Sequence, residues 1–274
     1  MLIRSKPNRN KMKTDLINYL VNAKRYHLTL RKILRFLNYK AESYTYAVLG
    51  QIVKHPILNI RNIRINYDPN DEGLREAIIS VLISDFYTDI IDTHVKMVVD
   101  AGAHQGLFTL LAIKHLKARK VLAIEPEKSN ILKLARNVAL NKAGDYVICI
   151  NCALGAHDYI GTLYVSGSSH LHTIINGCNS VRDKVKVHIF KLDTLAKILN
   201  VDFIDLLKLD VEGAEYEALK GSKKLLENRR MRTIVGEIHS EYIMRNSVKL
   251  LKDHGYSVDI YKLSNTIRII ATST

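Results

Sequence analysis

The sequence predicts an α/β fold, in which a mostly parallel sheet carries helices on both faces and ends in an antiparallel hairpin. Three observations support this prediction. From residue 95 onward, apolar strand-like runs alternate with helix-like patterns, as in sheets built by right-handed crossovers. Polar residues and glycines follow the strand ends, where such sheets bind ligands. Two alternating runs close the chain at 257–262 and 266–272. Residues 56–274 are therefore predicted to form one domain.

The individual elements follow from their hydrophobic periodicity. The alternating run 57–67 indicates a strand or hairpin, and 72–91 has the apolar content of a largely buried helix. Five strands of the main sheet are expected at 95–100, 120–125, 146–151, 204–210 and 232–238. The accompanying helices are expected at 105–117, 127–142, 214–227 and 240–253. Alternation at 159–166 and 184–190 predicts an inserted hairpin after the third strand.

Residues 1–55 differ in composition and are predicted to form a basic helical extension. Of the net charge of +14, residues 1–70 contribute +11, with 14 Lys and Arg against 3 Asp and Glu. Residues 14–37 combine an apolar stripe with a basic face, which is typical of a helix on an anionic membrane surface. A solvated helix that packs on its own domain has the same pattern. The partner of this segment stays open between an anionic membrane, a carrier and the chain itself.

The remaining composition predicts a cytoplasmic protein, which the basic helix could bring to a membrane as a peripheral contact. The first residues show no secretory signal, and no run approaches 18 uninterrupted apolar residues. The 3 cysteines are too few for a disulfide framework. The chain has no Trp and no basic run interleaved with aromatic residues, so we do not expect nucleic-acid binding. The sequence does not indicate an oligomeric state.

The strongest local pattern is VVDAGAHQG, in which an apolar strand ends at Asp100 and a tight turn enters a helix. Gly102 and Gly106 flank the turn, because residues without a Cβ permit sharp turns and close approach to a ligand. Ala103 and His104 lie inside it and belong to the same predicted cofactor-binding loop. The spacing differs from the Gly-x-Gly-x-x-Gly of dinucleotide sites, and an acid at the strand end suits a sulfonium or amino group.

The second strand ends in Glu125, which Pro126 follows. A carboxylate at this point of a doubly wound sheet can accept hydrogen bonds from both ribose hydroxyls. An acid favoured by the dipole of the next helix is the alternative. Cys152 and Ala153 follow the third strand, where such a sheet places the adenine. Cys149 and Cys152 have no second pair to complete a zinc site, and we predict neither redox nor metal function.

Polar residues also gather at the ends of the fourth and fifth strands. Lys208 and Asp210 are two apart on a strand, so their side chains point to the same side. Glu237 and His239 follow the fifth apolar run. Because parallel strands present their carboxyl ends at one edge of the sheet, these four residues are the predicted catalytic group. His239 or Asp210 would act as the general base, and imidazole is the usual choice near neutral pH.

Taken together, these residues resemble the FkbM family of methyltransferases, over about residues 60–260. The most specific element is the string Lys-x-Asp-x-Glu-Gly-x-Glu. One departure is visible, because the first motif of the family commonly has Asn where this chain has His104. The segments that carry the resemblance are Val98 to Gly106, Ala123 to Pro126, Asn137 to Asn141, Leu192-Asp193, Lys208 to Glu215 and Glu237 to His239.

The resemblance implies a Rossmann-like class I methyltransferase with a seven-stranded, mostly parallel sheet that binds S-adenosylmethionine. It implies that Asp100, Gly102 and Gly106 shape the methionine-side loop, that Glu125 holds the ribose, and that Asp210 faces the sulfonium and the acceptor. The implied reaction is O-methylation of a hydroxyl on a sugar, glycan or other small metabolite. The alternatives are a nicotinamide-dependent oxidoreductase, which the glycine spacing disfavours, and a non-catalytic protein that binds anionic surfaces.

Overall fold

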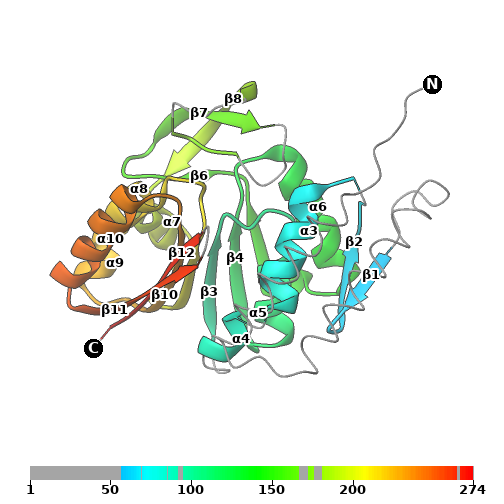
Figure 1. Cartoon of the computed structure of the whole chain (residues 1–274), viewed down its shortest axis with the longest axis horizontal. Coiled ribbons are helices and arrows are strands. Elements are labelled where there is room, and N and C mark those ends of the chain that lie inside the picture. The colour runs from blue at the N-terminus through cyan, green and yellow to red at the C-terminus, as the bar shows by residue number, and fades with distance from the viewer. Residues whose placement is uncertain are drawn as a thin grey trace. The chain divides into compact units, whose positions relative to one another are not determined.

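The structure is a computed structural model that describes residues 57–273, with gaps at 69, 85, 92–94, 167–171, 176–180 and 264–265. Figure 1 draws the described residues in colour. The predicted extension 1–55, including the amphipathic segment 14–37, lies outside the described residues. Within the described part of the chain, no helix has the length and apolar character needed to cross a bilayer.

Seven strands form the central sheet, in the spatial order β11-β12-β10-β9-β3-β4-β5. The five strands from β10 to β5 run parallel, whereas β12 lies antiparallel to both β10 and β11. This confirms the predicted mostly parallel sheet with a terminal antiparallel hairpin. The strands are β3 (Met97–Ala101), β4 (Lys120–Ile124), β5 (Val147–Ile150), β9 (Ile204–Leu209), β10 (Met231–Ile238), β11 (Tyr256–Leu263) and β12 (Thr266–Ser273).

The direction of winding reverses at the middle of this sheet. The chain runs outward from β3 through β4 to β5 and then returns to β9 on the other side of β3. The loops that follow β3 and β9 therefore leave the sheet side by side, at the switch point where doubly wound sheets bind ligands. All six residues of β9 are buried, and one of them is the cation Lys208. Because a buried charge needs partners, Lys208 must be paired with opposite charge at this point.

Helices cover both faces of the sheet, as right-handed crossovers require (Figure 1). The predicted helix 214–227 is wrong in one respect, since it is two helices separated at Gly221. A Cβ at Gly221 would lie 2.0 Å from the carbonyl oxygen of Gly155, so only glycine fits at this point. A helix missing from the prediction precedes β9. The helices are α5 (Leu107–Lys114), α6 (Lys128–Leu140), η2 (Gly144–Tyr146), α7 (Leu192–Ile198), α8 (Glu215–Lys220), α9 (Lys223–Glu227) and α10 (Glu241–Asp253).

The predicted helix 72–91 is helical but irregular. It consists of α3 (Glu72–Ala77), a π-helical turn η1 (Ile78–Ile83) and α4 (Phe86–Ile90). The Asp71 carboxylate caps its start by accepting a hydrogen bond from the backbone N–H of Leu74 at 3.0 Å. The π turn adds one residue between hydrogen-bonded partners, so the segment changes direction while its apolar face stays buried. This segment forms one wall of the site described below.

An antiparallel hairpin, β1 (Ile57–Ile60) and β2 (Ile63–Asn66), confirms the alternation at 57–67. Asn137 of α6 and Asn141, which follows the last residue of that helix, hydrogen-bond to the backbone of β2 as a neighbouring strand would. The side chain of Asn141 accepts from the N–H of Arg64 at 2.9 Å and donates to its carbonyl at 2.6 Å. That of Asn137 accepts from the N–H of Asn66 and donates to the carbonyl of Gln105. The Asn137–Asn141 segment is thus a structural clamp.

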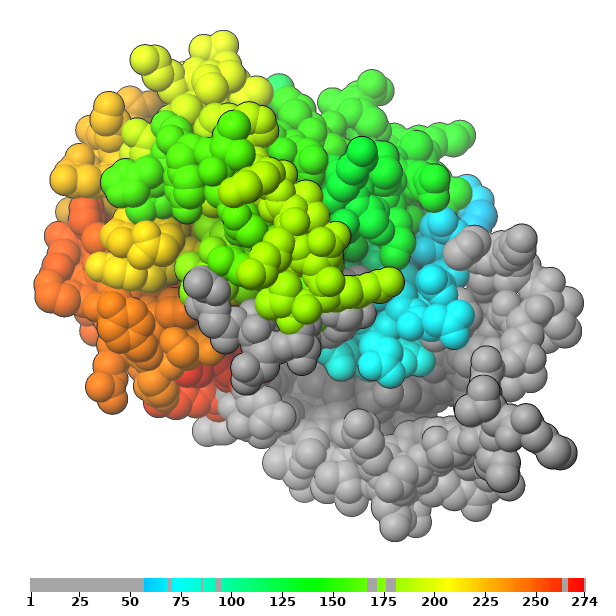
Figure 2. All heavy atoms as spheres, turned by 90° about the horizontal axis from the view of Figure 1, so that it is seen from above, coloured from blue at the N-terminus to red at the C-terminus, as the bar shows by residue number. Residues whose placement is uncertain are grey.

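The inserted hairpin is also confirmed, as part of a three-stranded sheet with the order β6-β8-β7. Its strands are β6 (Ala153–Leu154), β7 (Tyr159–Ser166) and β8 (Val181–Phe190). Figure 1 places this sheet above the carboxyl ends of the parallel strands. Figure 2 views the molecule from that side, with the green to yellow-green residues of the hairpin in the middle of the face. The insertion therefore adjoins the ligand-binding edge of the main sheet.

Candidate active site

Two cavities lie at the carboxyl ends of β3 and β9, and Gly102, Asp210 and Glu212 line both of them. The first, here called the apolar cavity, contains one buried carboxylate, Glu125, among mostly hydrophobic groups. Its other lining residues include Ile124, Pro126, Cys152, Ala153, Leu154, Val211 and Ala214. The second, here called the charged cavity, has a volume of about 290 Å³. Its lining includes Glu76, Ser80, Ala103, His104, Lys208, Glu237, Thr266 and Arg268.

The glycine loop after β3 packs directly on the loop after β9. Gly102 has a φ of +77°, and a Cβ there would lie 1.7 Å from the carbonyl oxygen of Asp210. Only glycine combines the left-handed conformation with so close a contact. The loop is also held to β4, because the N–H groups of Gly102 and Ala103 both donate to the carbonyl of Ile124 at 3.0 Å. This architecture explains the first glycine of the motif.

Lys208 links the loop after β3 to the loop after β9. Its Nζ donates to the carbonyl of Gly102 at 2.9 Å and lies 3.1 Å from Asp210 Oδ2 and 3.7 Å from Asp100 Oδ1. Burial opposes its charge, but the Asp210 and Asp100 carboxylates outweigh burial and raise the pKa of Lys208. The residue is therefore a permanent cation that fixes the position of Asp210 beneath both cavities.

Asp100 lies deeper than the sequence analysis expects. It is wholly buried and lines neither cavity; its Oδ2 accepts a hydrogen bond from the hydroxyl of Thr109 at 2.6 Å. Burial raises its pKa even though Lys208 and Thr109 favour the charged form. Gly106 also lies outside both cavities and begins α5 with a φ of +85°. These two residues support the loop from behind, and their predicted cofactor contacts stay predictions.

Glu125 faces the apolar cavity from the end of β4. Its two carboxylate oxygens accept hydrogen bonds from the backbone N–H groups of His104 at 2.8 Å and Glu127 at 3.0 Å. Burial raises the pKa of Glu125 to about 7, although these two N–H groups favour the ionised form. Each carboxylate oxygen has a second lone pair, so the group can still accept hydrogen bonds from a ligand. Cys152 is a neutral thiol at this cavity, because burial raises its pKa to about 12.

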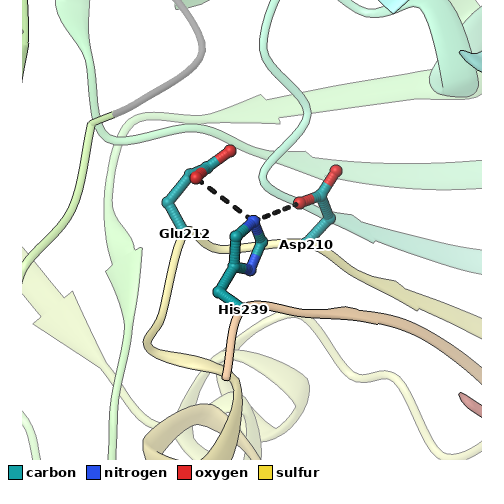
Figure 3. Close-up of side chains that lie close together, drawn as sticks. All are labelled: Asp210, Glu212 and His239. Carbon is teal, nitrogen blue, oxygen red and sulfur yellow. Dashed lines mark ion pairs between the residues drawn. The ribbon is translucent and has the colours of Figure 1, made fainter. Parts of the chain in front are cut away.

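Asp210, Glu212 and His239 form a tight group at the mouth of the site (Figure 3). His239 Nε2 lies 3.2 Å from Glu212 Oε2 and 3.9 Å from Asp210 Oδ1. Glu212 reaches this position from a left-handed backbone conformation, with a φ of +53°. Burial disfavours the ionised form of Asp210, but the neighbouring cations Lys208 and His239 favour it and outweigh burial, so the net pKa of Asp210 is lowered. Asp210 is therefore ionised near neutral pH.

The imidazole of His239 is held on its other side by Glu215. Glu215 Oε1 lies 2.9 Å from His239 Nδ1 and also accepts hydrogen bonds from the N–H groups of Val211 and Gly213. Burial opposes the imidazolium, but Glu212 and Glu215 outweigh it and raise the pKa of His239 to about 11. In this arrangement the ring is a cation with both nitrogens engaged, which differs from the neutral base that the sequence analysis expects.

A buried ion pair forms the far wall of the charged cavity. Arg268 of β12 pairs in register with Glu237 of β10, and its Nε and Nη2 lie 3.2 and 3.1 Å from Glu237 Oε2. The guanidinium also stacks over the ring of Phe86, 4.4 Å from its centroid. Burial and Asp210 raise the pKa of Glu237, and Arg268 opposes this shift. Sequence reasoning missed Arg268, although a lone arginine in an apolar terminal strand was a signal for it.

The sequence-predicted residues therefore separate into three groups. Glu125, Pro126, Cys152 and Ala153 line only the apolar cavity, Ala103, His104, Lys208 and Glu237 line only the charged cavity, and Gly102 and Asp210 line both. Asp100, Gly106 and His239 line neither cavity, and His239 Nε2 lies 3.9 Å from Asp210 Oδ1. Asp193 of the Leu192-Asp193 motif is structural, since its carboxylate accepts from the N–H groups of Lys224 and Leu225 at the start of α9.

The strand order and the two cavities at the switch point define a Rossmann-like protein with a ligand-binding site at the carboxyl edge of its sheet. The sequence profile described as the Methyltransferase FkbM domain matches residues 100–258. The chain belongs to the FkbM family of methyltransferases, as the motifs predicted. The profile begins at Asp100 and covers both cavity-forming loops.

Curated relatives support the same assignment. The chain is 32% identical over 195 residues to methyltransferase sdnD of Sordaria araneosa, which covers 59% of this chain and 73% of that protein. It is 28% identical over 145 residues to methyltransferase 1 of Beauveria bassiana, covering 46% of this chain and 58% of that protein. In fold it resembles the crystal structure of methyltransferase FkbM from Methylobacillus flagellatus, with a TM-score of 0.50 and 18% identity. That match covers 68% of this chain and 46% of the other.

Proposed function

We propose that the protein transfers a methyl group from S-adenosylmethionine to a hydroxyl oxygen of a sugar, glycan or other small metabolite. One observation carries the proposal. A mostly apolar cavity, in which Glu125 is the one buried carboxylate, shares Gly102, Asp210 and Glu212 with a charged cavity at the switch point of the sheet. A ligand that has a nucleoside base, a ribose and a cationic centre would match the two cavities. The base would lie in the apolar cavity, the ribose beside Glu125 and the cationic centre near Asp210.

The residues of the first cavity fit the nucleoside part of such a cofactor. Glu125 would accept hydrogen bonds from the ribose hydroxyls, and Cys152 and Ala153 would contact the adenine. The backbone of Gly102 and the Asp210 carboxylate border the position where the two cavities meet. When bound, S-adenosylmethionine supplies the methyl group already activated on a sulfonium. The chain therefore needs chiefly to orient an acceptor, which can lower a barrier by roughly 7–11 kcal/mol.

The apolar cavity is narrow as it stands, with a volume of about 40 Å³. A space of this size holds about three water molecules. His172 and Ile174, from the segment that follows β7, line it together with Leu163. Adenine binding therefore requires these side chains to move outward. The inserted hairpin supplies the groups that would then cover the adenine.

The charged cavity supports a hydroxyl-bearing acceptor. Ser80 and the Glu237–Arg268 pair all line this cavity and present hydrogen-bonding groups to it, which suits an acceptor rich in hydroxyl groups. Asp210, held ionised by Lys208, can accept a hydrogen bond from the reacting hydroxyl and orient its oxygen. A hydroxyl must lose its proton on methylation, so an ionised group at this position supports O-methylation over transfer to an already unprotonated atom.

The first test is thermal unfolding of the full chain with S-adenosylhomocysteine and, separately, NAD. A ligand at 100 times its Kd adds about 2.7 kcal/mol to the free energy of unfolding, a shift of several degrees for a chain of this size. We expect this shift with S-adenosylhomocysteine, a smaller one in Glu125→Gln, and the wild-type shift in the control Glu227→Gln, which alters an exposed carboxylate of α9. Transfer of labelled methyl to hydroxylated acceptors then tests the reaction. A shift with NAD alone would contradict the proposal.

A further inference from the structure

We propose that Asp210, Glu212 and His239 form a divalent-cation site that binds the oxygen of the acceptor beside the methyl donor. This inference rests on the proposed function and adds a metal to it, whereas the sequence analysis predicts none. Its starting point is the group in Figure 3, in which two carboxylates and one imidazole converge from two neighbouring strand ends. One ligand atom from each residue lies within 4.8 Å of the others.

The spacing of the three ligand atoms suits a small cation. Oxygen and nitrogen ligands bind such ions at about 2.0–2.2 Å, which puts neighbouring ligand atoms roughly 3 Å apart. The distances from His239 Nε2 are 3.2 Å to Glu212 and 3.9 Å to Asp210. Only small side-chain movements separate this arrangement from a coordination shell. Three protein ligands also leave positions open for water or substrate.

Glu215 provides the second, independent observation. It is wholly buried, and its Oε1 lies 2.9 Å from His239 Nδ1 while two backbone N–H groups hold it in place. Its other oxygen, Oε2, is buried without a hydrogen-bond partner. A carboxylate behind a histidine is the usual support of a metal-binding imidazole, because it accepts a hydrogen bond from Nδ1–H and so turns Nε2 toward the ion. Here Nε2 faces Asp210 and Glu212.

The balance of charge also favours a cation at this point. Lys208 lies close to Asp210 and Asp100, and no lysine or arginine ion pair is recorded for Glu212 or Glu215 within the described residues. Those two carboxylates share His239. A divalent ion would neutralise the group while the imidazole gives up the proton on Nε2. The competing explanation is an imidazolium that serves only as a structural ion pair, and the experiment separates the two.

A cation here would complete the mechanism. Asp210 and Glu212 line the charged cavity, so an ion between them would be reachable by an acceptor hydroxyl. Binding to the ion would favour loss of the hydroxyl proton to water, as it does for metal-bound water. The resulting oxygen attacks the methyl carbon, the carbon–sulfur bond breaks, and sulfur keeps the electron pair. Two carboxylates and one imidazole suit Mn²⁺ or Mg²⁺, with Mn²⁺ the more accessible probe.

The test is Mn²⁺ binding to the metal-stripped full chain, measured by electron paramagnetic resonance and by isothermal titration calorimetry. We expect one Mn²⁺ per chain. We expect at least a 10-fold weaker Kd in Glu212→Gln and a 10–100-fold weaker Kd in Glu215→Gln, which removes the support of His239. Glu217→Gln is the matched control, because Glu217 also lies at the start of α8 but pairs with Lys220 at the surface. It should bind Mn²⁺ as the wild type does.

Absence of Mn²⁺ binding by the wild type at millimolar concentration would overturn the inference and leave the imidazolium ion pair as the explanation. If Glu217→Gln weakened Mn²⁺ binding as much as Glu212→Gln does, the inference would likewise be overturned. Circular dichroism checks that each variant folds; Glu212→Asn, which tolerates a left-handed backbone, replaces Glu212→Gln if that variant does not. Binding of S-adenosylhomocysteine without metal is measured in parallel. If it persists while Mn²⁺ fails to bind, the cation site is wrong and the methyltransferase proposal stands.

Discussion

At the scale of single residues, backbone conformation accounts for the one departure from the family motif. His104 stands where the family commonly has Asn, and its φ is +50°. Asn and His are both enriched among non-glycine residues with positive φ, so the substitution keeps the turn. The N–H of His104 still donates to Glu125, and this bond depends on the backbone rather than on the side chain. The departure therefore changes the polarity of the charged cavity and not the shape of the loop.

The contact between Gly102 and Asp210 leads to a graded set of variants. Gly102→Ala adds both backbone strain and a clash with the Asp210 carbonyl, so we expect it to lose more than about 2 kcal/mol of stability and most of its S-adenosylhomocysteine affinity. At Gly213 the φ is +95°, but a Cβ would meet no neighbouring atom. Gly213→Ala therefore adds backbone strain alone, and we expect it to lose about 1 kcal/mol of stability. Gly144→Ala meets neither problem and serves as the control. Urea unfolding and calorimetry measure both quantities. Equal losses in Gly102→Ala and Gly213→Ala would show that the close contact does not matter.

The pKa of Glu125 leads to a dependence of stability on pH. Its folded-state pKa of about 7 lies above the ordinary value of 4.5, so the native state holds this proton more tightly than the unfolded state. The contribution of this proton to the stability of the folded protein is therefore complete below pH 4.5 and is lost as the pH rises through 7. Between pH 5 and 8 we expect the wild type to lose about 2–3 kcal/mol relative to Glu125→Gln, which cannot titrate. Urea unfolding of both proteins across this range measures the difference, and parallel curves would contradict the assignment.

At the scale of elements, periodicity predicted all seven strands of the main sheet and the inserted hairpin, because buried parallel strands are apolar runs between clear turns. It failed where backbone contacts decide the geometry. The break between α8 and α9 coincides with the close approach of Gly221 to Gly155, two residues far apart in the sequence. The π turn within 78–83 likewise leaves no pattern in the hydrophobic residues. Such features depend on tertiary packing, which periodicity does not record.

The asparagine clamp on β2 leads to a prediction at this scale. Asn141→Ala removes both hydrogen bonds to Arg64 and leaves two backbone groups without those partners, so we expect a loss of about 1–3 kcal/mol. Faster hydrogen exchange should appear at the amides of β2. Asn246→Ala is the control, since Asn246 is a partly exposed residue of α10 whose side-chain amide donates to the carbonyl of Tyr242 in its own helix. Unchanged exchange in β2 would show that the sheet-like contact does not hold the hairpin.

At the scale of the whole molecule, the order of elements predicted where the site lies. It did not predict which residues line which cavity. The carboxyl ends of the strands brought Lys208, Asp210, Glu125 and His239 to one edge, as expected for a doubly wound sheet. Arg268 was missed because it comes from the antiparallel hairpin, whose register with β10 is not readable from either strand alone. The burial of Asp100 was also unforeseen, since spacing along a strand does not give depth.

The bridge from Lys208 to Gly102 and Asp210 has a further consequence. In the proposed reaction it would join the loop beside the methyl donor to the carboxylate beside the acceptor, so a ligand that tightens one contact would also change the other. Thermodynamic linkage makes such an effect reciprocal: the factor by which one ligand changes the affinity for the second equals the factor in the opposite direction. If the bridge tightens on binding, the complex with both ligands is favoured over either complex with one, and the donor is held most firmly when an acceptor is present to receive its methyl group.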